Sequence, residues 1–515
     1  MRATGTRRWW ALGAVMLAVL AVGMDITVLS VALPTLSGAL KASESDLQWF
    51  SSAYTLVLAA MMLPAGLLGD RYGRKKVILC SLALFAVGSL ACAYSRSAAE
   101  FVAARILLGF AGAGVVVMAI SALTVLFSQE ERPRAVGIWA AINMISFPVG
   151  PILGGWLLSH YWWGWVFLMN VPVALLGIVA VAALVPESAS PARPGFDAIG
   201  VASSSGGLVG VTFGFIEAGE HGWGSASAIG ALLAGLALIM MFFGWERFLQ
   251  RRPGGQPLVD LGLFRSASFT WGVILFTVLT LALVGLLFTM PQYFQGVMGT
   301  SPEGSGIRLL PAVGGLMAGL LPAAWLAKTI GPKLTIAAGF VVLAAGLSIG
   351  ATTTLSSGEG FVAGWMAVAG AGTGLTMATA ASAALAQLSE ERAGVGSGVL
   401  QALKNTGAPL GAAILGSALS SAYVSRLHLA RLPVAAAAAA RGSVFGGVAA
   451  ARLLHSPALL ISVRGAFVHG VDVALAVSVG FALLGMVLSL VFMPGRAAQL
   501  PPAAEGVPGG ERVAA

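Results

Sequence analysis

Gly69-Asp70-Arg71-Tyr72-Gly73-Arg74-Lys75-Lys76 is a dense charged stretch between two long apolar runs. Only 10% of the 515 residues are charged, so a stretch this polar must lie in water while its neighbours do not. We therefore expect a tight loop that joins two membrane-spanning helices at a membrane surface. An ordinary basic loop would explain the four basic residues, but it would explain neither Asp70 nor the two glycines.

The composition excludes a soluble globule. Hydrophobic residues make up 58% of the chain, whereas soluble domains carry about 25% charged residues. A helix needs roughly 20 apolar residues to cross the bilayer. We expect an all-α integral membrane protein with about fourteen spans, near residues 11–34, 48–68, 77–95, 101–126, 135–158, 164–184, 200–217, 226–246, 270–292, 305–326, 334–354, 361–388, 395–420 and 468–492.

The basic residues are distributed by topology and are not gathered on one face. Arg7, Arg8 and the charged stretch fall on one side, whereas the short loops of the other side hold only Lys41, Arg96 and Arg308. The positive-inside rule then places both termini in the cytoplasm. The net charge of +9 therefore indicates a cytoplasmic-membrane protein and does not indicate nucleic-acid binding.

Two parts of the chain echo one another. Glu130-Glu131-Arg132 recurs as Glu390-Glu391-Arg392, and Pro148-Val149-Gly150 recurs as Pro409-Leu410-Gly411. The nearly constant offsets indicate two six-helix repeats, with two extra helices between them. Transporters built from parallel repeats place their substrate site between the repeats, near the membrane midplane.

Several stretches resemble those of the major facilitator transporters, and in particular their fourteen-span drug:proton antiporter branch. The charged stretch is similar to that family's loop between spans two and three. Further similar stretches are Asp25 to Val28, Trp165 to Pro172, Phe196-Asp197, Pro257 to Leu261, Pro291 to Gln295 and Phe467 to Asp472. Ser30 and Trp163-Gly164-Trp165 depart from the family pattern.

The domain expectations combine the spans with this resemblance. We expect a cytoplasmic N-terminus at 1–10, a six-helix bundle at 11–184 and the extra helices with their linkers at 185–268. A second six-helix bundle with a long external loop at 421–466 would occupy 269–495, and a disordered cytoplasmic tail 496–515. We expect a monomer with no cofactor and no metal.

Charged residues inside the spans are the first candidates for function. Asp25 lies mid-span, where an ionised carboxylate costs about 2.5–3.5 kcal/mol. Protonation removes that cost, so Asp25 is a candidate proton carrier; alternatively it is a packing residue bonded to a hydroxyl such as that of Thr27. Arg105 occupies the position to which the resemblance assigns an embedded arginine that stabilises a deprotonated acid, and snorkelling to the surface is its alternative.

Gly150-Pro151-Ile152-Leu153-Gly154-Gly155 in span five matches the antiporter signature G-P-x-x-G-G. Glycine permits close helix approach and proline bends a helix, so this stretch is a candidate pivot for alternating access. The pivot residues are Pro148, Gly150, Pro151, Gly154 and Gly155.

Two further groups complete the candidate site. Lys404 and Asn405 lie in the thirteenth span; Lys404 would pair with an acid or an anionic substrate group, or else be solvated. The gating loop consists of Gly69, Asp70, Arg71, Gly73, Arg74 and Lys75, whose basic residues would latch Glu130 or Glu131.

These patterns favour a secondary transporter over its rivals. The chain has no H-E-x-x-H motif and no nucleotide-binding G-x-x-x-x-G-K-S/T motif. We expect a proton-coupled antiporter that exports amphipathic drugs or secondary metabolites, the alternative being a major facilitator that carries a single metabolite. Counting only Asp25, Arg105 and Lys404 as embedded charges predicts a preference for neutral, monocationic or anionic substrates over dications.

Overall fold

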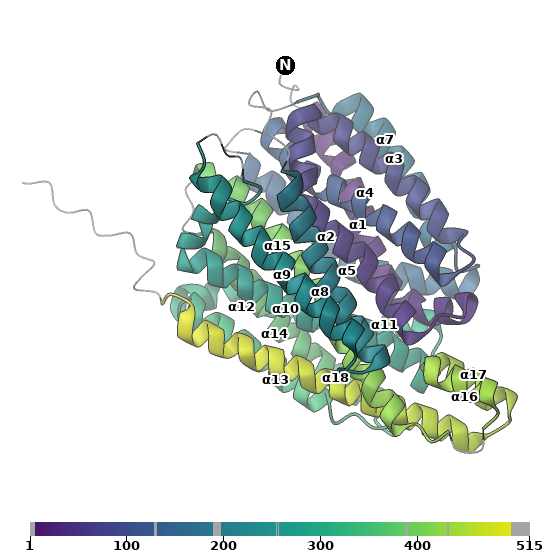
Figure 1. Ribbon diagram of the computed structural model, residues 1–515. Helices are drawn as coiled ribbons and strands as arrows, with labels where there is room; N and C mark the ends of the chain where they lie inside the picture. The colour runs from purple at the N-terminus through teal and green to yellow at the C-terminus, as the bar shows by residue number, and fades with distance from the viewer. Residues whose placement is uncertain are drawn as a thin grey trace, which may run out of the picture.

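The computed structural model describes residues 6–127, 131–188, 197–253, 255, 257–386, 390–429 and 432–495, and its regular structure in these ranges is helical. Figure 1 shows long helices that run roughly alongside one another. The helices are α1 (Thr6–Leu40), α2 (Glu44–Tyr72), α3 (Arg74–Ala93), α4 (Ala98–Leu126), α5 (Arg132–His160), α6 (Trp165–Leu168), α7 (Asn170–Leu184), α8 (Ala198–His221), α9 (Ala226–Arg251), α10 (Ala267–Gln292), α11 (Pro302–Arg308), α12 (Leu310–Thr329), α13 (Pro332–Gly350), α14 (Glu359–Leu385), α15 (Glu390–Arg426), α16 (Val434–Gly442), α17 (Val444–Leu453) and α18 (Pro457–Phe492). A 3₁₀ turn (Leu261–Arg265) precedes α10, and a π-helical turn (Tyr293–Val297) continues it.

The number of membrane spans agrees with the sequence expectation. Within the described ranges, fourteen helical segments are long and apolar enough to cross a bilayer. Two short helices join longer ones: α6 with α7 forms the sixth span, and α11 with α12 forms the tenth. The predicted fold class, an all-α membrane protein with about fourteen spans, is confirmed.

The segment expected as the long loop 421–466 is mostly helical. Helix α15 continues to Arg426, α16 and α17 follow, and α18 begins at Pro457 instead of near residue 468. Alanine has the strongest helix propensity, which accounts for α16 in the Ala-rich run. The Ser456 side chain caps the first turn of α18, and Pro457 suits the first helical position. The expected tail 496–515 lies outside the described residues.

The two six-helix repeats pack in the same way. In the N-terminal bundle α1 packs on α5, α2 and α3 on α4, and α3 on α7. The C-terminal bundle repeats these pairs as α10 on α15, α12 and α13 on α14, and α13 on α18. Equivalent helices therefore occupy equivalent places, as parallel repeats require.

The extra helices α8 and α9 form a hairpin across the side of the molecule (Figure 1). Their backbones approach closely at small residues: a Cβ on Gly210 would lie 2.9 Å from the Cα of Gly235. Helix α8 packs on α2 and on α15, one from each bundle. The hairpin therefore spans the seam between the bundles.

We call the end of the molecule that bears residues 69–76 the charged-loop end, and the other the opposite end. The bundles touch one another at the opposite end. Gln295 Nε2 donates to the Val31 carbonyl at 3.0 Å, and the Glu303 amide donates to Ser159 Oγ at 3.3 Å. The α16–α17 hairpin also lies at this end (Figure 1), where Ser443 Oγ is 3.4 Å from Ser37 Oγ of α1.

Candidate functional site

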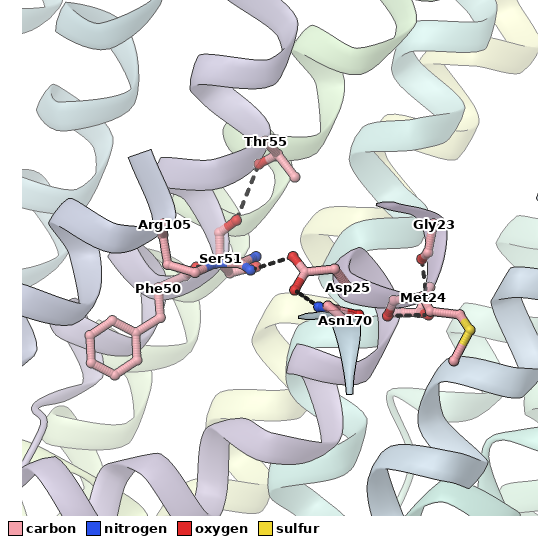
Figure 2. Close-up of polar contacts among 9 residues, drawn as sticks. Gly23, Met24, Asp25, Phe50, Ser51, Thr55, Arg105 and Asn170 are labelled. Atoms are coloured by element: carbon pink, nitrogen blue, oxygen red, sulfur yellow. Dashed lines mark hydrogen bonds and ion pairs between the residues drawn. The ribbon is translucent and has the colours of Figure 1, made fainter. Parts of the chain in front are cut away.

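Asp25 and Arg105 form a buried ion pair in the core of the N-terminal bundle. Arg105 Nη1 lies 2.6 Å from Asp25 Oδ2, and the two side chains are 1% and 0% exposed. Asn170 Nδ2 donates to the other carboxylate oxygen at 3.1 Å. Figure 2 shows Arg105 and Asn170 reaching Asp25 at its two oxygens. One carboxylate thus links α1, α4 and α7.

Arg105 has two further partners on α2. Its Nε donates to the Phe50 carbonyl at 3.2 Å, and its guanidinium carbon lies 4.5 Å from the centroid of the Tyr54 ring. This burial excludes snorkelling to a surface. Thr27 bonds elsewhere, since its hydroxyl donates to the Ser146 carbonyl at 3.1 Å, so the packing alternative for Asp25 loses its named partner.

Sequence reasoning missed Asn170 and Tyr54. Asn170 stands within the stretch from Trp165 to Pro172, and an amide in an otherwise apolar span was the available signal. Tyr54 gave no such signal, because a tyrosine in an apolar helix is common in membrane proteins. The Tyr54 hydroxyl is buried without a hydrogen-bond partner in the described structure.

The glycines of the candidate pivot face two different helices. Gly150 and Gly154 lie against α1, and a Cβ on Gly150 would stand 3.0 Å from the Met24 carbonyl oxygen. Gly155 faces α11, where a Cβ would stand 2.7 Å from the Pro302 carbonyl oxygen. Pro148 and Pro151 lie inside α5. The stretch therefore joins α1 of its own bundle to α11 of the other.

We expect Gly155→Val to separate α5 from α11, because the added atoms would overlap the backbone of Pro302 and Glu303. Overpacking costs about 1–3 kcal/mol. At about 1.4 kcal/mol per factor of ten, the bundle contact should weaken roughly 5- to 150-fold. Thiol labelling of Ser305→Cys, a buried position on α11, measures the opening in a protein that carries Cys80→Ser and Cys92→Ala. The control is Gly137→Val, which has open space around it; equal labelling in both variants would contradict the contact.

The gating-loop residues contact the last turn of α7 and the segment that follows it. The Asp70 carboxylate pairs with Arg74 at 2.9 Å. The Lys75 backbone amide donates to Glu187 Oε1 at 3.2 Å, and the Lys75 side-chain ammonium donates to the Ala182 carbonyl at 2.6 Å. The Arg71 guanidinium lies 5.5 Å from the centroid of the Tyr72 ring. Glu187 is thus a contact that sequence reasoning missed.

The predicted latch to Glu131 is not the contact seen. Glu131 pairs with Arg8 of α1 at 2.6 Å, and Glu130 lies outside the described residues. The physical reason is the connection: the chain after α7 returns to the charged-loop end beside α3, so its carboxylate reaches Lys75 first. The loop therefore fastens α2 and α3 to α7 within one bundle.

The two glycines of this loop have distinct reasons. Gly73 has φ +111°, which favours glycine, and it separates α2 from α3 in a single residue. Gly69 lies against the Met118 side chain of α4, so a side chain at position 69 would have to displace the end of Met118.

We expect Asp70→Asn to slow turnover several-fold while substrate affinity stays within a factor of two. The change removes the ionic partner of Arg74, an exposed-pair contribution of about 0.2–1 kcal/mol, far from the membrane midplane. Initial transport rates at several substrate concentrations separate the two quantities. Lys76→Gln in the same loop is the control, and a large affinity loss at unchanged turnover would contradict a mechanical role.

Lys404 and Asn405 lie where α15 meets α10 and α2. The Lys404 ammonium is 5.4 Å from the centroid of the Phe276 ring, and the described residues contain no acid paired with it. Asn405 Nδ2 is 3.1 Å from Met62 Sδ, a contact between the bundles. Lys404 is half-buried, so neither the predicted ion pair nor full solvation describes it.

The set of embedded charges inferred from sequence was incomplete. Glu44 and Glu246 are buried within helices, and Asp472 lies well inside α18 with one buried oxygen unpartnered. Asp25 is neutralised by Arg105. The sequence-based preference for neutral, monocationic or anionic substrates over dications did not count these further acids, and it stays a prediction.

An apolar pocket lies in the C-terminal bundle next to the candidate pivot. Four helices of that bundle, α10, α12, α13 and α14, form it together with one residue of α5. Its lining residues are Pro151, Ala282, Leu283, Leu286, Leu287, Leu309, Ala312, Val313, Leu316, Leu343, Leu347, Ala369, Gly370 and Thr373. The pocket suits the apolar part of a small molecule.

Twelve spans in two equivalent bundles, two extra spans between them and a charged pair inside one bundle define a multi-pass membrane transporter built from parallel repeats. The comparison with protein families agrees. A model of the Major Facilitator Superfamily matches residues 15–200 and 195–412, so the chain belongs to this family. The predicted family is confirmed.

Individual relatives cover most of the chain. The tetracenomycin C resistance and export protein of Streptomyces glaucescens is 34% identical over 411 residues, 80% of this chain and 76% of the relative. The methyl viologen resistance protein SmvA of Salmonella typhimurium is 32% identical over 421 residues, 80% of this chain and 82% of the relative.

Solved structures share the fold. One is a bacterial homolog of the human lysosomal transporter Spinster, in an inward-facing and unoccupied conformation. It matches with a TM-score of 0.69 at 15% identity and covers 97% of this chain and 100% of that chain. At 15% identity, this similarity supports the assignment of the fold and no statement about function.

Proposed function

We propose that the protein is a proton-coupled antiporter that exports amphipathic drugs or secondary metabolites across the cytoplasmic membrane. The observation that carries the proposal is the buried Asp25–Arg105 pair, held at 2.6 Å in the core of the first bundle. A titratable carboxyl at such a place is rare without a task. Relatives named for resistance and export support the direction of transport.

The charged-loop end faces the cytoplasm in this proposal. The basic residues of Arg71 to Lys76, with Arg7 and Arg8, gather at this end, as the positive-inside rule requires of cytoplasmic loops. The opposite end, where the bundles touch, then faces outward. The described conformation is consequently closed toward the outside, and both termini are cytoplasmic.

Protonation of Asp25 changes which helices are held together. Arg105 stays charged at any physiological pH, so the proton goes to the carboxylate. Once Asp25 is neutral, the guanidinium keeps the Phe50 carbonyl and the Tyr54 ring, both on α2. Its hold on α1 weakens. Because α1 also meets the second bundle at Val31, a looser α1 can transmit proton binding to the contact between bundles.

The energy of one proton is sufficient for this work. A proton that returns down about 150 mV releases roughly 3.5 kcal/mol, at about 2.3 kcal/mol per 100 mV. At about 1.4 kcal/mol per factor of ten, this supports a gradient of a few hundred-fold for a neutral substrate.

The substrate class follows from the walls of the apolar pocket. Leucine, alanine and valine side chains line it, and its threonine hydroxyl, that of Thr373, already donates to the Ala369 carbonyl at 2.9 Å. Such walls bind apolar groups with little demand on their shape. The relatives' names refer to tetracenomycin C and to methyl viologen, an organic dication, so we propose that the substrates are amphipathic aromatic compounds and that no single net charge is required of them.

Drug accumulation in cells tests this function. An efflux-deficient bacterial strain that expresses the protein should accumulate several-fold less of at least one amphipathic aromatic compound than the empty strain. The panel includes methyl viologen and aromatic polyketide antibiotics, and a proton ionophore should abolish the difference. Export that persists after the proton gradient is collapsed would refute proton coupling, and protection against none of the panel would refute the substrate class.

A further inference from the structure

Glu44 is a second buried carboxyl, at the seam between the bundles on the opposite end. It lies in the first turn of α2 and is 4% exposed. Gln292 of α10, in the other bundle and 0% exposed, holds its Nε2 at 3.4 Å from Glu44 Oε1. This long contact is the one hydrogen bond found for the Glu44 side chain in the described structure.

The groups around Glu44 are uncharged. Among the described residues, Tyr423 of α15 is a titratable group within electrostatic range of Glu44, and its hydroxyl donates to the Ala440 carbonyl of α16 at 2.7 Å. From α10 Glu44 faces Gln292, and one turn along its own helix lies Gln48. No basic side chain pairs with Glu44 in the parts of the chain that the structure describes, since Lys41 is exposed and Arg464 of α18 donates to the Gly296 carbonyl.

The polar side chains around Glu44 include oxygens that need a hydrogen-bond donor. Within the described residues, Gln48 Oε1 and Gln292 Oε1 are both buried acceptors for which no hydrogen-bond donor is found. A protonated Glu44 can donate its O–H to such an acceptor, whereas an ionised Glu44 would add another acceptor to the cluster. The start of α2 favours the anion, but the helix dipole contributes less than a buried, unpaired carboxylate loses in hydration.

We propose that Glu44 is a second proton-binding site, which is protonated while the bundles are closed at this end and ionised when they part. With the orientation given under the proposed function, the site exchanges its proton with external water. Closing the outer seam then takes up one proton, and opening it releases one. Asp25 lies in the core of the first bundle, so the two carboxyls have separate roles.

Linkage between proton binding and conformation gives the direction in which pH shifts the open–closed equilibrium. The closed state binds one more proton than the open state, so acid favours closure and alkali favours opening. One proton makes the ratio of open to closed molecules rise by up to tenfold per pH unit. This steepest rise occurs in the pH range where Glu44 is ionised in the open state and still protonated in the closed state. Glu44→Gln removes this dependence because the amide does not titrate.

Spin-label distances across the opposite end test the proposal. Ala99 at the start of α4 and Ser356 between α13 and α14 are exposed and belong to different bundles. Labels on Ala99→Cys and Ser356→Cys, in the full chain with Cys80→Ser and Cys92→Ala, report the separation in lipid nanodiscs from pH 5 to pH 9. We expect the long-distance fraction to grow with pH, and to stay constant in Glu44→Gln.

Three variants make the result decisive. Glu44→Asp keeps a carboxyl and should restore a pH response, which shows that a flat Glu44→Gln response is not a folding defect. Glu220→Gln, an exposed acid at the same end, should respond like the wild type. A pH response that survives in Glu44→Gln, or a wild-type distance that does not change with pH, would overturn the proposal. In Asp25→Asn the response should persist, so failure of the proposed antiport leaves this test intact.

Discussion

Asp25→Asn should abolish proton-driven efflux while leaving a folded protein in the membrane. The amide has the size of the carboxyl and can still accept a hydrogen bond from Arg105, but it cannot titrate. The few-hundred-fold gradient that one proton supports should therefore collapse to equal concentrations on the two sides. Substrate accumulation in inverted vesicles with an imposed pH gradient measures this loss.

Glu220→Gln is the matched control for that change, because it also converts an acid to its amide but lies exposed at the end of α8. We expect wild-type accumulation from the control. Full accumulation in Asp25→Asn would show that Asp25 is a structural residue and that the proton travels elsewhere.

Arg105→Met should both block transport and destabilise the first bundle. Removing one partner of a buried ion pair costs about 3–5 kcal/mol, because the other charge stays buried without compensation. Here the loss also includes the bond to the Phe50 carbonyl and the contact with the Tyr54 ring. Thermal unfolding of the purified protein in detergent measures the stability. Arg96→Met, at an exposed arginine, is the control.

The double variant Asp25→Asn with Arg105→Met gives a second reading of the same pair. Residues in one buried network show interaction energies of about 0.5–3 kcal/mol. The double variant should therefore be more stable than the sum of the two single effects implies. Additive losses would mean that the two side chains do not act as a pair in the membrane.

The number and type of elements could be predicted because the bilayer imposes them. Each span needs a long apolar helix, and that requirement is visible in composition alone. The ends of the spans were harder to predict from the sequence. Helix α18 begins at Pro457 because of a serine cap and packing against α17. Neither feature is visible in the apolar pattern, which begins only near residue 468.

The candidate site was predicted to the extent that charge stands out in an apolar helix. Asp25 and Arg105 met this condition, although their pairing across 80 positions became visible only in three dimensions. Asn170, 145 positions from Asp25, and Tyr54 are neutral and gave little contrast with their spans. Glu44 follows a capping serine, so in sequence it resembles an ordinary solvated helix start.

For the gating loop, the sequence identified the residues but not the acid that they contact. Its charges and glycines were recognised from the pattern, and the structure gives both glycines a geometric reason. Its acid contact in the described structure is Glu187, whereas Glu131 pairs with Arg8 and Glu130 lies outside the described residues. In sequence, Glu131 and Glu187 are equally plausible partners. Only the return of the chain beside α3 makes Glu187 the nearer one.

Proton flux in purified proteoliposomes tests the central claim most directly. Wild-type protein is reconstituted with a pH-sensitive dye inside the vesicles, without an imposed gradient, and an exported compound is then added outside. Exchange through Asp25 predicts that substrate uptake into the lumen is matched by proton movement out of it, so the lumen becomes alkaline in wild type and stays unchanged in Asp25→Asn. Substrate uptake with no change in luminal pH, or an equal pH change in wild type and Asp25→Asn, would contradict it.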